Sequence, residues 1–391
     1  MNNEFGSARE LTWAAVTARR LERHHLATPR PDTRPVDVVK AMSGAHAQIL
    51  AAAELSIGIR IEGIDRAAIR DALWTERSLV KTFGPRGTVH LLPTEDLPIW
   101  TGALGAVPVP PHRMPPDARM TPDQADAVIE AIGVALEDSE LTIDELTEAV
   151  AARAGSWAGD RVMPAFQDAW PRWRQITDVA ANRGVLCFGP NRGRKITYTN
   201  PHRWLPGFRP LDGPSAVAEV VRRYLHAYGP ARSEDFARWL AAPPRWAADA
   251  FGALGDELVR VRLGENVTWQ LASDADLRDG DPPRGVRLLS YFDAYAVGSH
   301  PRSLLFPGRA FDRALARGQA GNFPVVLVDG TVGGIWHQRG SGRDLGLTVE
   351  LFEPLDAGRR RDLDAQVARL ADFLEVRPRM TFGTIPVGPH A

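Results

Sequence analysis

Hydrophobic residues recur at helical spacing through the first part of the chain and then give way to two short runs bounded by Gly and Pro. The spacing predicts helices over residues 8–23, 36–42 and 65–73. The runs at 79–83 and 88–92, separated by Gly84-Pro85-Arg86-Gly87, predict two strands joined by a tight turn. Helices followed by a β-hairpin are the ingredients of a winged helix, in which the hairpin forms the wing.

The same order of elements recurs twice along the chain. The second copy has predicted helices over residues 121–136, 143–154 and 171–183, then strands at 184–188 and 196–199. The third copy has predicted helices over residues 215–228, 234–240 and 244–254, then strands at 258–263 and 267–271. Each copy is roughly 60 to 100 residues long, the size of a compact small domain.

The pattern changes to strands after Pro282-Pro283. Strands are predicted at residues 286–290, 323–329, 331–336 and 345–352, with Asp329-Gly330 as a hairpin turn. A last helix is predicted over residues 361–373. The chain therefore reads as an α+β protein with three winged-helix domains at 8–110, 119–206 and 213–275 and a β-rich C-terminal domain at 284–378.

Composition narrows the class of partner. The formal net charge of -1 shows no global excess of positive charge, so any site for nucleic acid must be local. The single cysteine, Cys187, excludes an internal disulfide or a Cys-rich zinc site, and it is expected to be buried in a strand. Neither a signal-peptide pattern nor an apolar run of about 18 residues occurs. We expect a cytoplasmic, nucleoid-associated protein without a membrane segment.

The Ala-rich stretch from residue 40 to 60 carries two hydrogen-bonding side chains, His46 and Gln48, in a context typical of a protein core. The pattern predicts that both lie on a helix, with Ser43 as its N-cap. Residues two apart on a regular helix point about 200° from each other, so a shared site needs a helix start or irregular backbone. On pattern alone, a structural role at a helix junction and a catalytic role both remain open.

Three blocks of sequence resemble one known family, in the same order along the chain. They are RGTVHLLPTEDL at residues 86–97, YFDAYAVGSHPRSLLF at 291–306 and VVLVDGTVGGIW at 325–336. Each is similar to a characteristic block of the AlkZ-like (YcaQ-type) DNA glycosylases, winged-helix proteins that excise alkylated bases. The resemblance implies a C-shaped protein around a DNA channel. It also places the family's catalytic motif, Gln-x-Gln or Gln-x-Asp with His-x-Gln as a variant, on His46-Ala47-Gln48.

That resemblance implies a monofunctional glycosylase acting on N7- or N3-alkylated purines, with bulky adducts, interstrand crosslinks or self-resistance in some members. Alkylation makes the base cationic, so its departure leaves an oxocarbenium-like sugar and needs modest help. A glutamine such as Gln48 can orient water and face the developing charge. A neutral histidine such as His46 can accept a proton from that water.

Further residues are candidates for contacts with DNA, each with a bland alternative. Those on predicted hairpins could instead be ordinary turn residues or solvated charge, and Asp293, His300 and Arg302 could instead form an internal salt bridge. They are Arg86, His90, Arg192, Arg194, Lys195, Asp293, His300, Arg302 and Arg339. No metal or cofactor is expected, because no His, Asp or Glu spacing requires one.

The expected partner is duplex DNA with alkylated bases, bound by a monomer. The rival interpretation is a winged-helix DNA-binding protein or transcription regulator without catalysis. A regulator usually commits a polar helix to the major groove. The third helices here are instead rich in Trp and Ala, which favours the enzyme weakly.

Overall fold

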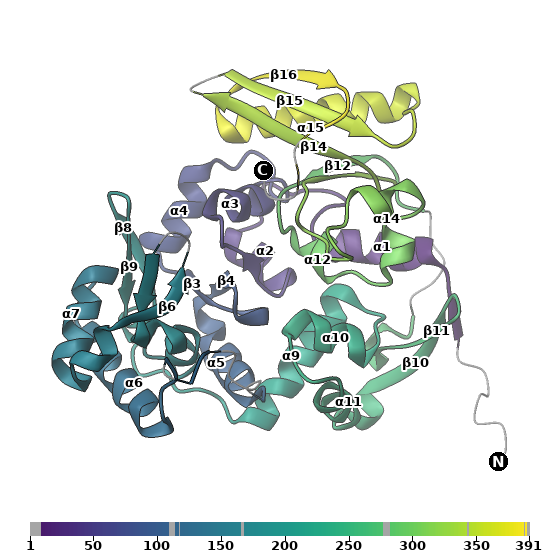
Figure 1. The fold of residues 1–391 in the computed structure, drawn as a ribbon. Coiled ribbons are helices and arrows are strands. Elements are labelled where there is room, and N and C mark those ends of the chain that lie inside the picture. The colour runs from purple at the N-terminus through teal and green to yellow at the C-terminus, as the bar shows by residue number, and fades with distance from the viewer. Residues whose placement is uncertain are drawn as a thin grey trace, which may run out of the picture. The chain divides into compact units, whose positions relative to one another are not determined.

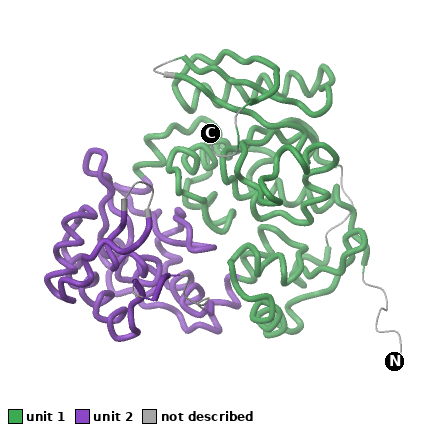
Figure 2. Tube along the Cα trace, in the orientation of Figure 1, with its two compact units in different colours: residues 1–71, 221–391 green, residues 72–220 purple. Residues whose placement is uncertain are grey.

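The structure is a computed structural model that describes residues 9–108, 114–116, 118–165, 168–276, 282–341, 344–386 and 388. It mixes helices and strands (Figure 1) and divides into two compact units (Figure 2). Unit 1 holds residues 1–71 and 221–391, and unit 2 holds residues 72–220. Residues 8 and 110, the predicted limits of the first domain, lie outside the described residues.

The N-terminal part of unit 1 is mainly helical. Its elements are β1 (Arg9–Leu11), α1 (Trp13–Arg23), α2 (Pro35–Ala41), β2 (Ala45–His46), α3 (Leu50–Gly58) and α4 (Arg66–Trp74), which runs on into unit 2. The helix predicted from residue 8 begins only at Trp13, after Thr12 caps it by accepting a hydrogen bond from the Ala15 N–H. The preceding residues are a strand because they pair in parallel with a partner far along the chain.

That partner is the hairpin of the third helix-and-strand group. The group consists of α9 (Gly213–Tyr228), α10 (Ser233–Leu240), α11 (Pro244–Gly252), β10 (Leu258–Leu263) and β11 (Asn266–Leu271). β10 is antiparallel to β11 and parallel to β1, which gives a sheet of three strands. The predicted hairpin is therefore confirmed, and the N-terminus adds a strand that local pattern did not predict.

The C-terminal part of unit 1 is a five-stranded sheet with helices. The strands are β12 (Val286–Leu289), β13 (Val325–Val328), β14 (Thr331–Ser341), β15 (Asp344–Leu351) and β16 (Arg377–Phe382), in that order. The helices are α12 (Ala294–Gly298), α13 (Arg302–Leu305), α14 (Arg309–Arg313) and α15 (Ala357–Leu374). Figure 1 shows α15 running alongside β14, β15 and β16. β14 continues five residues past its predicted end, and β16, parallel to β15, was not predicted.

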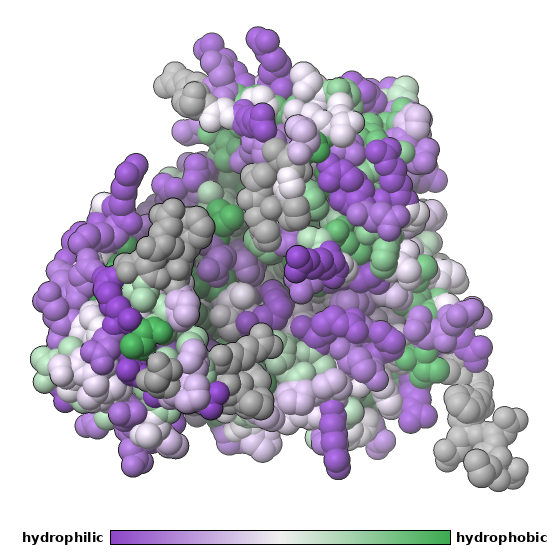
Figure 3. All heavy atoms as spheres, in the orientation of Figure 1, coloured by the Kyte–Doolittle hydropathy of each residue, from purple (hydrophilic) through white to green (hydrophobic). Residues whose placement is uncertain are grey.

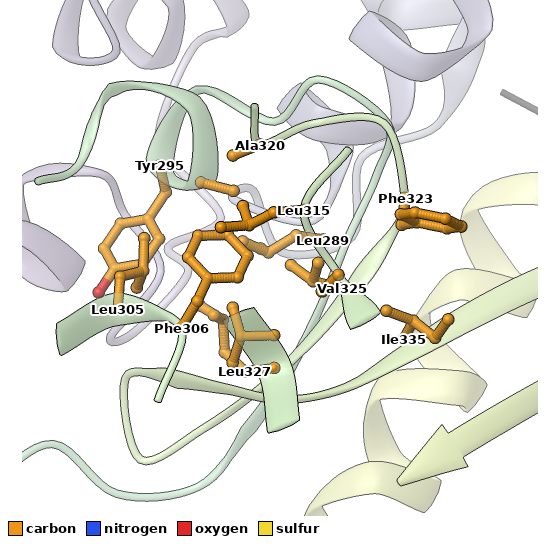
Figure 4. Packing of buried hydrophobic residues seen from close by; sticks show 14 of the residues in the cluster. Leu289, Tyr295, Leu305, Phe306, Leu315, Ala320, Phe323, Val325, Leu327 and Ile335 are labelled. Carbon is orange, nitrogen blue, oxygen red and sulfur yellow. The ribbon is translucent and has the colours of Figure 1, made fainter. Parts of the chain in front are cut away.

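A hydrophobic core fixes the segment between β12 and β13. Figure 4 shows Leu289, Leu305, Phe306 and Leu327 packed together, with side chains contributed by the strands and by the short helices between them. Burying each such side chain contributes about 1.5–3 kcal/mol. The backbone that follows β12 is therefore held in one place, which matters for the site described below.

The described part of unit 2 contains three antiparallel pairs of consecutive strands and a set of helices. Its elements are β3 (Leu79–Phe83), β4 (Val89–Pro93), α5 (Leu97–Ala106), α6 (Pro122–Leu136), β5 (Leu141–Thr142), α7 (Ile143–Ala154), β6 (Arg161–Ala165), β7 (Asp168–Pro171), α8 (Thr177–Asn182), β8 (Cys187–Arg192) and β9 (Lys195–Thr199). Thr121 and Thr142 each form a capping box that starts the following helix. Cys187 is buried in β8, as predicted.

Two predictions in unit 2 were wrong in their bounds. The helix predicted over 171–183 is a 3-10 turn, Arg172–Ile176, followed by α8. The strand predicted at 184–188 is β8, Cys187–Arg192, so it begins three residues later and ends four residues later than predicted. Its ladder with β9 extends to Arg192. The turn between them therefore shrinks to Gly193-Arg194, where Gly193 has a φ of +63° that suits glycine.

On the face drawn in Figure 3, hydrophilic residues predominate and hydrophobic residues form small, separate groups. Within the described part of the chain, no helix combines the length and apolarity needed to cross a membrane.

Candidate active site

The segment between α2 and α3 is extended rather than helical. Ser43 and Gly44 both have positive φ, at +56° and +103°, and this pair ends α2 and redirects the chain. The prediction of a helix capped by Ser43 was therefore wrong: the next helix begins at Leu50, and the Ser43 hydroxyl donates to the backbone oxygen of Arg223 at 3.3 Å. His46 lies in β2, four residues ahead of α3.

Burial alternates along this segment. Ala45 and Ala47 are 1% and 0% exposed, whereas His46 is half-buried and Gln48 is exposed. Only Ala45–His46 forms a strand, and a bend follows at Gln48. His46 and Gln48 are the more accessible side chains of this segment, and because it is not helical the 200° separation expected on a helix does not apply.

His46 packs against Phe292, a residue that sequence reasoning did not single out. The two ring centroids are 4.4 Å apart with an angle of 31° between the planes. Phe292 has a φ of +53°, which costs about 1–2 kcal/mol for a non-glycine residue and persists only where surroundings hold it. Its N–H donates to the backbone oxygen of Gly321 at 2.9 Å. The available signal was its place in the YFDAY block, next to Asp293.

Gly321 is needed for this arrangement. Its own φ is +98°, and a Cβ there would come within 3.1 Å of the Phe292 Cα and 2.9 Å of Val297. A larger residue would therefore push on the backbone that carries the ring against His46.

Asp293 is the carboxylate of an internal salt bridge. Both of its oxygens accept hydrogen bonds from Arg60 at 2.8 Å, Ser56 donates to it at 2.7 Å, and both charged side chains are fully buried. Burial alone would raise the pKa of Asp293, but the charge and hydrogen bonds of Arg60, with help from Ser56, leave it below its usual value. Of the two alternatives for Asp293, the structure shows the internal ion pair, which ties α3 to the Phe292 segment.

His300 and Arg302 are also engaged inside unit 1. His300 is 5% exposed, with Nδ1 3.6 Å from a carboxylate oxygen of Asp235, and burial together with the charge of Arg302 lowers its pKa to about 3. The Arg302 guanidinium donates to the backbone oxygens of Val297 at 2.6 Å and Ser299 at 2.7 Å. Arg302 therefore satisfies carbonyl groups at the end of α12.

In unit 2, Arg86 and His90 belong to the β3–β4 hairpin. Arg86 has a φ of +64° in the 3-10 turn Pro85–Gly87 and is half-buried. His90 is 4% exposed, and its Nδ1 lies 2.9 Å from the backbone oxygen of Thr88, so this nitrogen donates. A Cβ at Gly84 would come within 2.8 Å of the His90 ring. His90 therefore braces the turn that presents Arg86.

The β8–β9 hairpin carries basic residues whose charge is largely balanced within unit 2. Arg192 donates to Glu145 at 2.8 Å, and the Lys195 ammonium lies 2.9 Å from Asp144. Both carboxylates come from the first turn of α7. Arg194, at the turn, is exposed. Arg339, in unit 1, is exposed on β14, where its Nε donates to the His337 ring at 3.3 Å.

Across the described residues, no group of three or more His, Cys, Asp and Glu side chains is placed to hold a metal ion. In unit 1, His46 and Gln48 are the candidate catalytic residues, and Phe292 lies against the histidine ring. The arrangement offers a hydrogen-bond acceptor, an amide and an aromatic face, which suits orientation of water better than covalent catalysis.

The sequence model of the family described as DNA glycosylase AlkZ-like matches residues 39–373. That stretch covers most of the chain and includes His46, Gln48 and Asp293. The chain belongs to the AlkZ-like DNA glycosylase family. The resemblance drawn from the three sequence blocks is thus confirmed, and the protein is a DNA glycosylase, an enzyme that hydrolyses N-glycosidic bonds.

A curated sequence and a solved structure, both from Streptomyces sahachiroi, are similar to this chain. One is an interstrand DNA cross-link repair glycosylase, 32% identical over 350 residues that make up 83% of this chain and 87% of the relative. The other is the solved structure of the DNA glycosylase AlkZ, with a TM-score of 0.80, 29% identity and coverage of 96% of this chain and 100% of that one. The mixed helix and strand fold is therefore shared.

Proposed function

We propose that this AlkZ-like glycosylase excises purines alkylated at N7 or N3, with bulky adducts or interstrand crosslinks among its substrates, in DNA repair or self-resistance. The observation that carries the proposal is the non-helical segment 45–48, in which His46 and Gln48 are more accessible than the buried alanines beside them. Crosslinks enter because the similar protein of Streptomyces sahachiroi is named for their repair.

The reaction needs limited assistance from the enzyme. An N7- or N3-alkylpurine carries positive charge, so its departure produces a neutral base and an oxocarbenium-like sugar. Water then forms a bond to the anomeric carbon and loses a proton. The protein must place that water and stabilise positive charge, and both tasks fall to neutral hydrogen-bonding groups.

Gln48 is accessible enough to place the attacking water. Its side chain is exposed and has no hydrogen-bond partner among the described residues. The carboxamide oxygen can accept from the attacking water and face the sugar's developing charge, while the amide donates to a phosphate or sugar oxygen.

His46 is proposed as the group that receives the proton from water. Its ring lies against Phe292, so the plane of the imidazole is fixed relative to the 45–48 segment. A neutral imidazole held in one orientation can accept a proton from water, which suits general-base assistance. Because no lysine takes part in this scheme, we propose hydrolysis that leaves an intact abasic site, as in a monofunctional enzyme.

The DNA-binding scaffold is part of the same proposal. Helices followed by hairpins occur in the three predicted ranges, 8–110, 119–206 and 213–275, and the β-rich part follows at 284–378. We propose that the three ranges act as winged helices on duplex DNA. A C-shaped arrangement around the duplex, a monomeric state and DNA contacts by Arg86, Arg194 and Arg339 remain within this proposal.

The test is an excision assay with duplex DNA carrying N7-methylguanine, a bulky N7 adduct or an N7-linked crosslink, scored as abasic sites after alkali. We expect excision by the wild type and a strong loss in Gln48→Ala. Gln366→Ala, the same change on α15, serves as the matched control. Tight DNA binding with no excision of any adduct would instead support a non-catalytic DNA-binding protein.

A further inference from the structure

The C-terminal sheet has one face covered by α15. The other face is buried near β12 and β13 by the core that includes Leu289 and Val325, and its more exposed part lies farther along β14, β15 and β16. On β15, Leu345, Leu347 and Val349 are buried, while the residues between them, Gly346 and Thr348, are exposed and half-buried. This two-residue alternation separates the two faces of the sheet.

The side on which α15 packs is identified by one contact. Phe382 of β16 is in register with Val349, and the Arg360 guanidinium, from α15, lies 3.9 Å from the centre of its ring. The buried residues of β15 therefore face α15. Gly346 and Thr348 face away from it.

Three arginines gather on the face away from α15. In register, Arg339 of β14 lies opposite Gly346 of β15, and Gly346 lies opposite Arg379 of β16. Directly paired residues of neighbouring strands share a face. Arg377, two residues before Arg379 on β16, shares that face as well. We call Arg339, Arg377 and Arg379 the arginine face.

The spacing leaves room for an anion between the arginines. Neighbouring strands lie about 4.8 Å apart, so Arg339 and Arg379 are separated by about 10 Å with Gly346 between them. Glycine places no side chain in that gap. Two long guanidinium side chains can therefore reach over an open strip of backbone from both sides.

The arginine face carries more positive than negative charge. The structure gives none of its three members an ion-pair partner among the described residues, and the contact of Arg339 is to His337. Asp344, opposite Arg377, is the acidic cross-strand neighbour. Glu350, further along β15, is bound by Arg313 at 2.9 Å. The face therefore keeps a net positive charge, unlike the β8–β9 hairpin.

We propose that the arginine face binds phosphates of the duplex away from the excised base. Guanidinium groups bind phosphate through paired N–H donors, and such contacts set the position of a protein on DNA without reading sequence. The proposal rests on the proposed action on duplex DNA. β16 lies beyond residue 373, where the family match ends, so Arg377 and Arg379 are features of this chain that the match does not include.

The experiment measures binding of full-length protein to an undamaged duplex at several salt concentrations. The variant is Arg377→Gln/Arg379→Gln, and the control is Arg361→Gln, an exposed arginine on α15 on the other side of the sheet. Each lost phosphate contact should reduce the salt slope by about 0.9, so the double variant should lose about 1.8 and bind about tenfold more weakly. Arg379→Lys should retain most of the slope.

Excision separates this proposal from the proposed function. At low enzyme concentration the double variant should excise more slowly than wild type, and saturating enzyme should restore the rate, because the face acts on binding. A salt slope equal to that of Arg361→Gln, with wild-type excision intact, would overturn the arginine face alone. A protein that never excises but loses its salt slope in the double variant would overturn the enzyme mechanism and support the face.

Discussion

Two polar pairs in unit 1, Arg60 with Asp293 and His46 with Gln48, differ in burial and in hydrogen bonding. Arg60 and Asp293 are fully buried, and each carboxylate oxygen accepts a hydrogen bond. His46 is half-buried and Gln48 is exposed, with no described partner for the glutamine. A polar group whose bonding capacity is satisfied internally supports the fold, whereas one with capacity turned outward is available to a ligand. Substitutions in the first pair should therefore lower stability, and substitutions in the second should lower the excision rate.

The largest expected effect is on stability, from breaking the buried pair. Asp293→Asn or Arg60→Met leaves a charged or polar group without its partner, which costs about 3–5 kcal/mol. The measurement is the urea midpoint of unfolding. The double variant Arg60→Met/Asp293→Leu removes both charges and should be less destabilised than either single change. If the free energy of unfolding of each single variant stayed within about 1 kcal/mol of wild type, close to the range of ordinary surface substitutions, the pair would not support the fold.

Changes at His46 and Gln48 should alter the excision rate without altering the free energy of unfolding. Gln48→Ala should lower the single-turnover excision rate at least tenfold, about 1.4 kcal/mol, because its bond to water matters mainly in the transition state. The urea midpoint and the affinity for DNA should stay close to wild type. Equal excision by Gln48→Ala and wild type would remove Gln48 from the mechanism.

His46→Gln tests what the histidine contributes. The resemblance gives glutamine as the commoner residue at this place in the family, so the variant should still excise. If His46 is the base, the fall in excision rate on acidification should be present in wild type and absent in the variant. The same pH profile in both proteins would argue for a positioning role instead.

Buried His24 should make the stability of the fold depend on pH. His24 is fully buried between Tyr228 and Tyr295, and burial, with a further contribution from the charge of Arg60, lowers its pKa to about 3. Unfolded, its pKa is about 6.5, so between those values the unfolded chain binds one more proton. Stability should fall as pH drops below 6.5, by about 1.4 kcal/mol per unit for this group.

His24→Gln should make that fall shallower. The measurement is the urea midpoint at pH 7, 6 and 5 for both proteins. His300, whose pKa is also lowered to about 3, should leave a residual slope in the variant. Parallel curves for wild type and variant would contradict a neutral, buried His24.

The smallest effect on the excision rate is expected from a change at Phe292. This residue precedes Asp293 and packs on His46, so it links the buried pair to the outward one. Aromatic pairs contribute about 0.5–1.5 kcal/mol beyond their burial, so Phe292→Leu should slow excision about two- to tenfold. A broadened pH profile with unchanged DNA affinity would be the mark of a loosened imidazole. A loss confined to affinity would instead place Phe292 in DNA binding.

Much of the helical framework could be predicted from the sequence. α6 and α7 begin at Thr121 and Thr142, whose capping boxes are local signals, and α15 follows a regular apolar stripe. The strands β1 and β16 were missed because each is held by a parallel partner supplied by another part of the chain. Such pairing leaves little trace in a few residues of local pattern.

The candidate site was chosen from the sequence, but its geometry could not be predicted from it. An Ala-rich run suits helix and strand alike, and the positive φ of Ser43 depends on its surroundings. The packing of Phe292 on His46 joins residues from distant parts of the chain. For Lys195, charge alone suggested a DNA contact, and only the fold shows that Asp144 lies 2.9 Å away.

The construction of unit 1 from both ends of the chain has a consequence for the timing of synthesis. Asp293 is 233 positions after Arg60, so at about 5–20 residues per second it emerges from the ribosome roughly 10 to 50 seconds later. Residues 72–220 have all been made by then, and unit 2 can fold while the first part of unit 1 waits. A nascent chain without Phe292 and Asp293 lacks the ring that packs on His46. Competence for excision therefore arises late, when no more than 98 of the 391 residues remain to be translated.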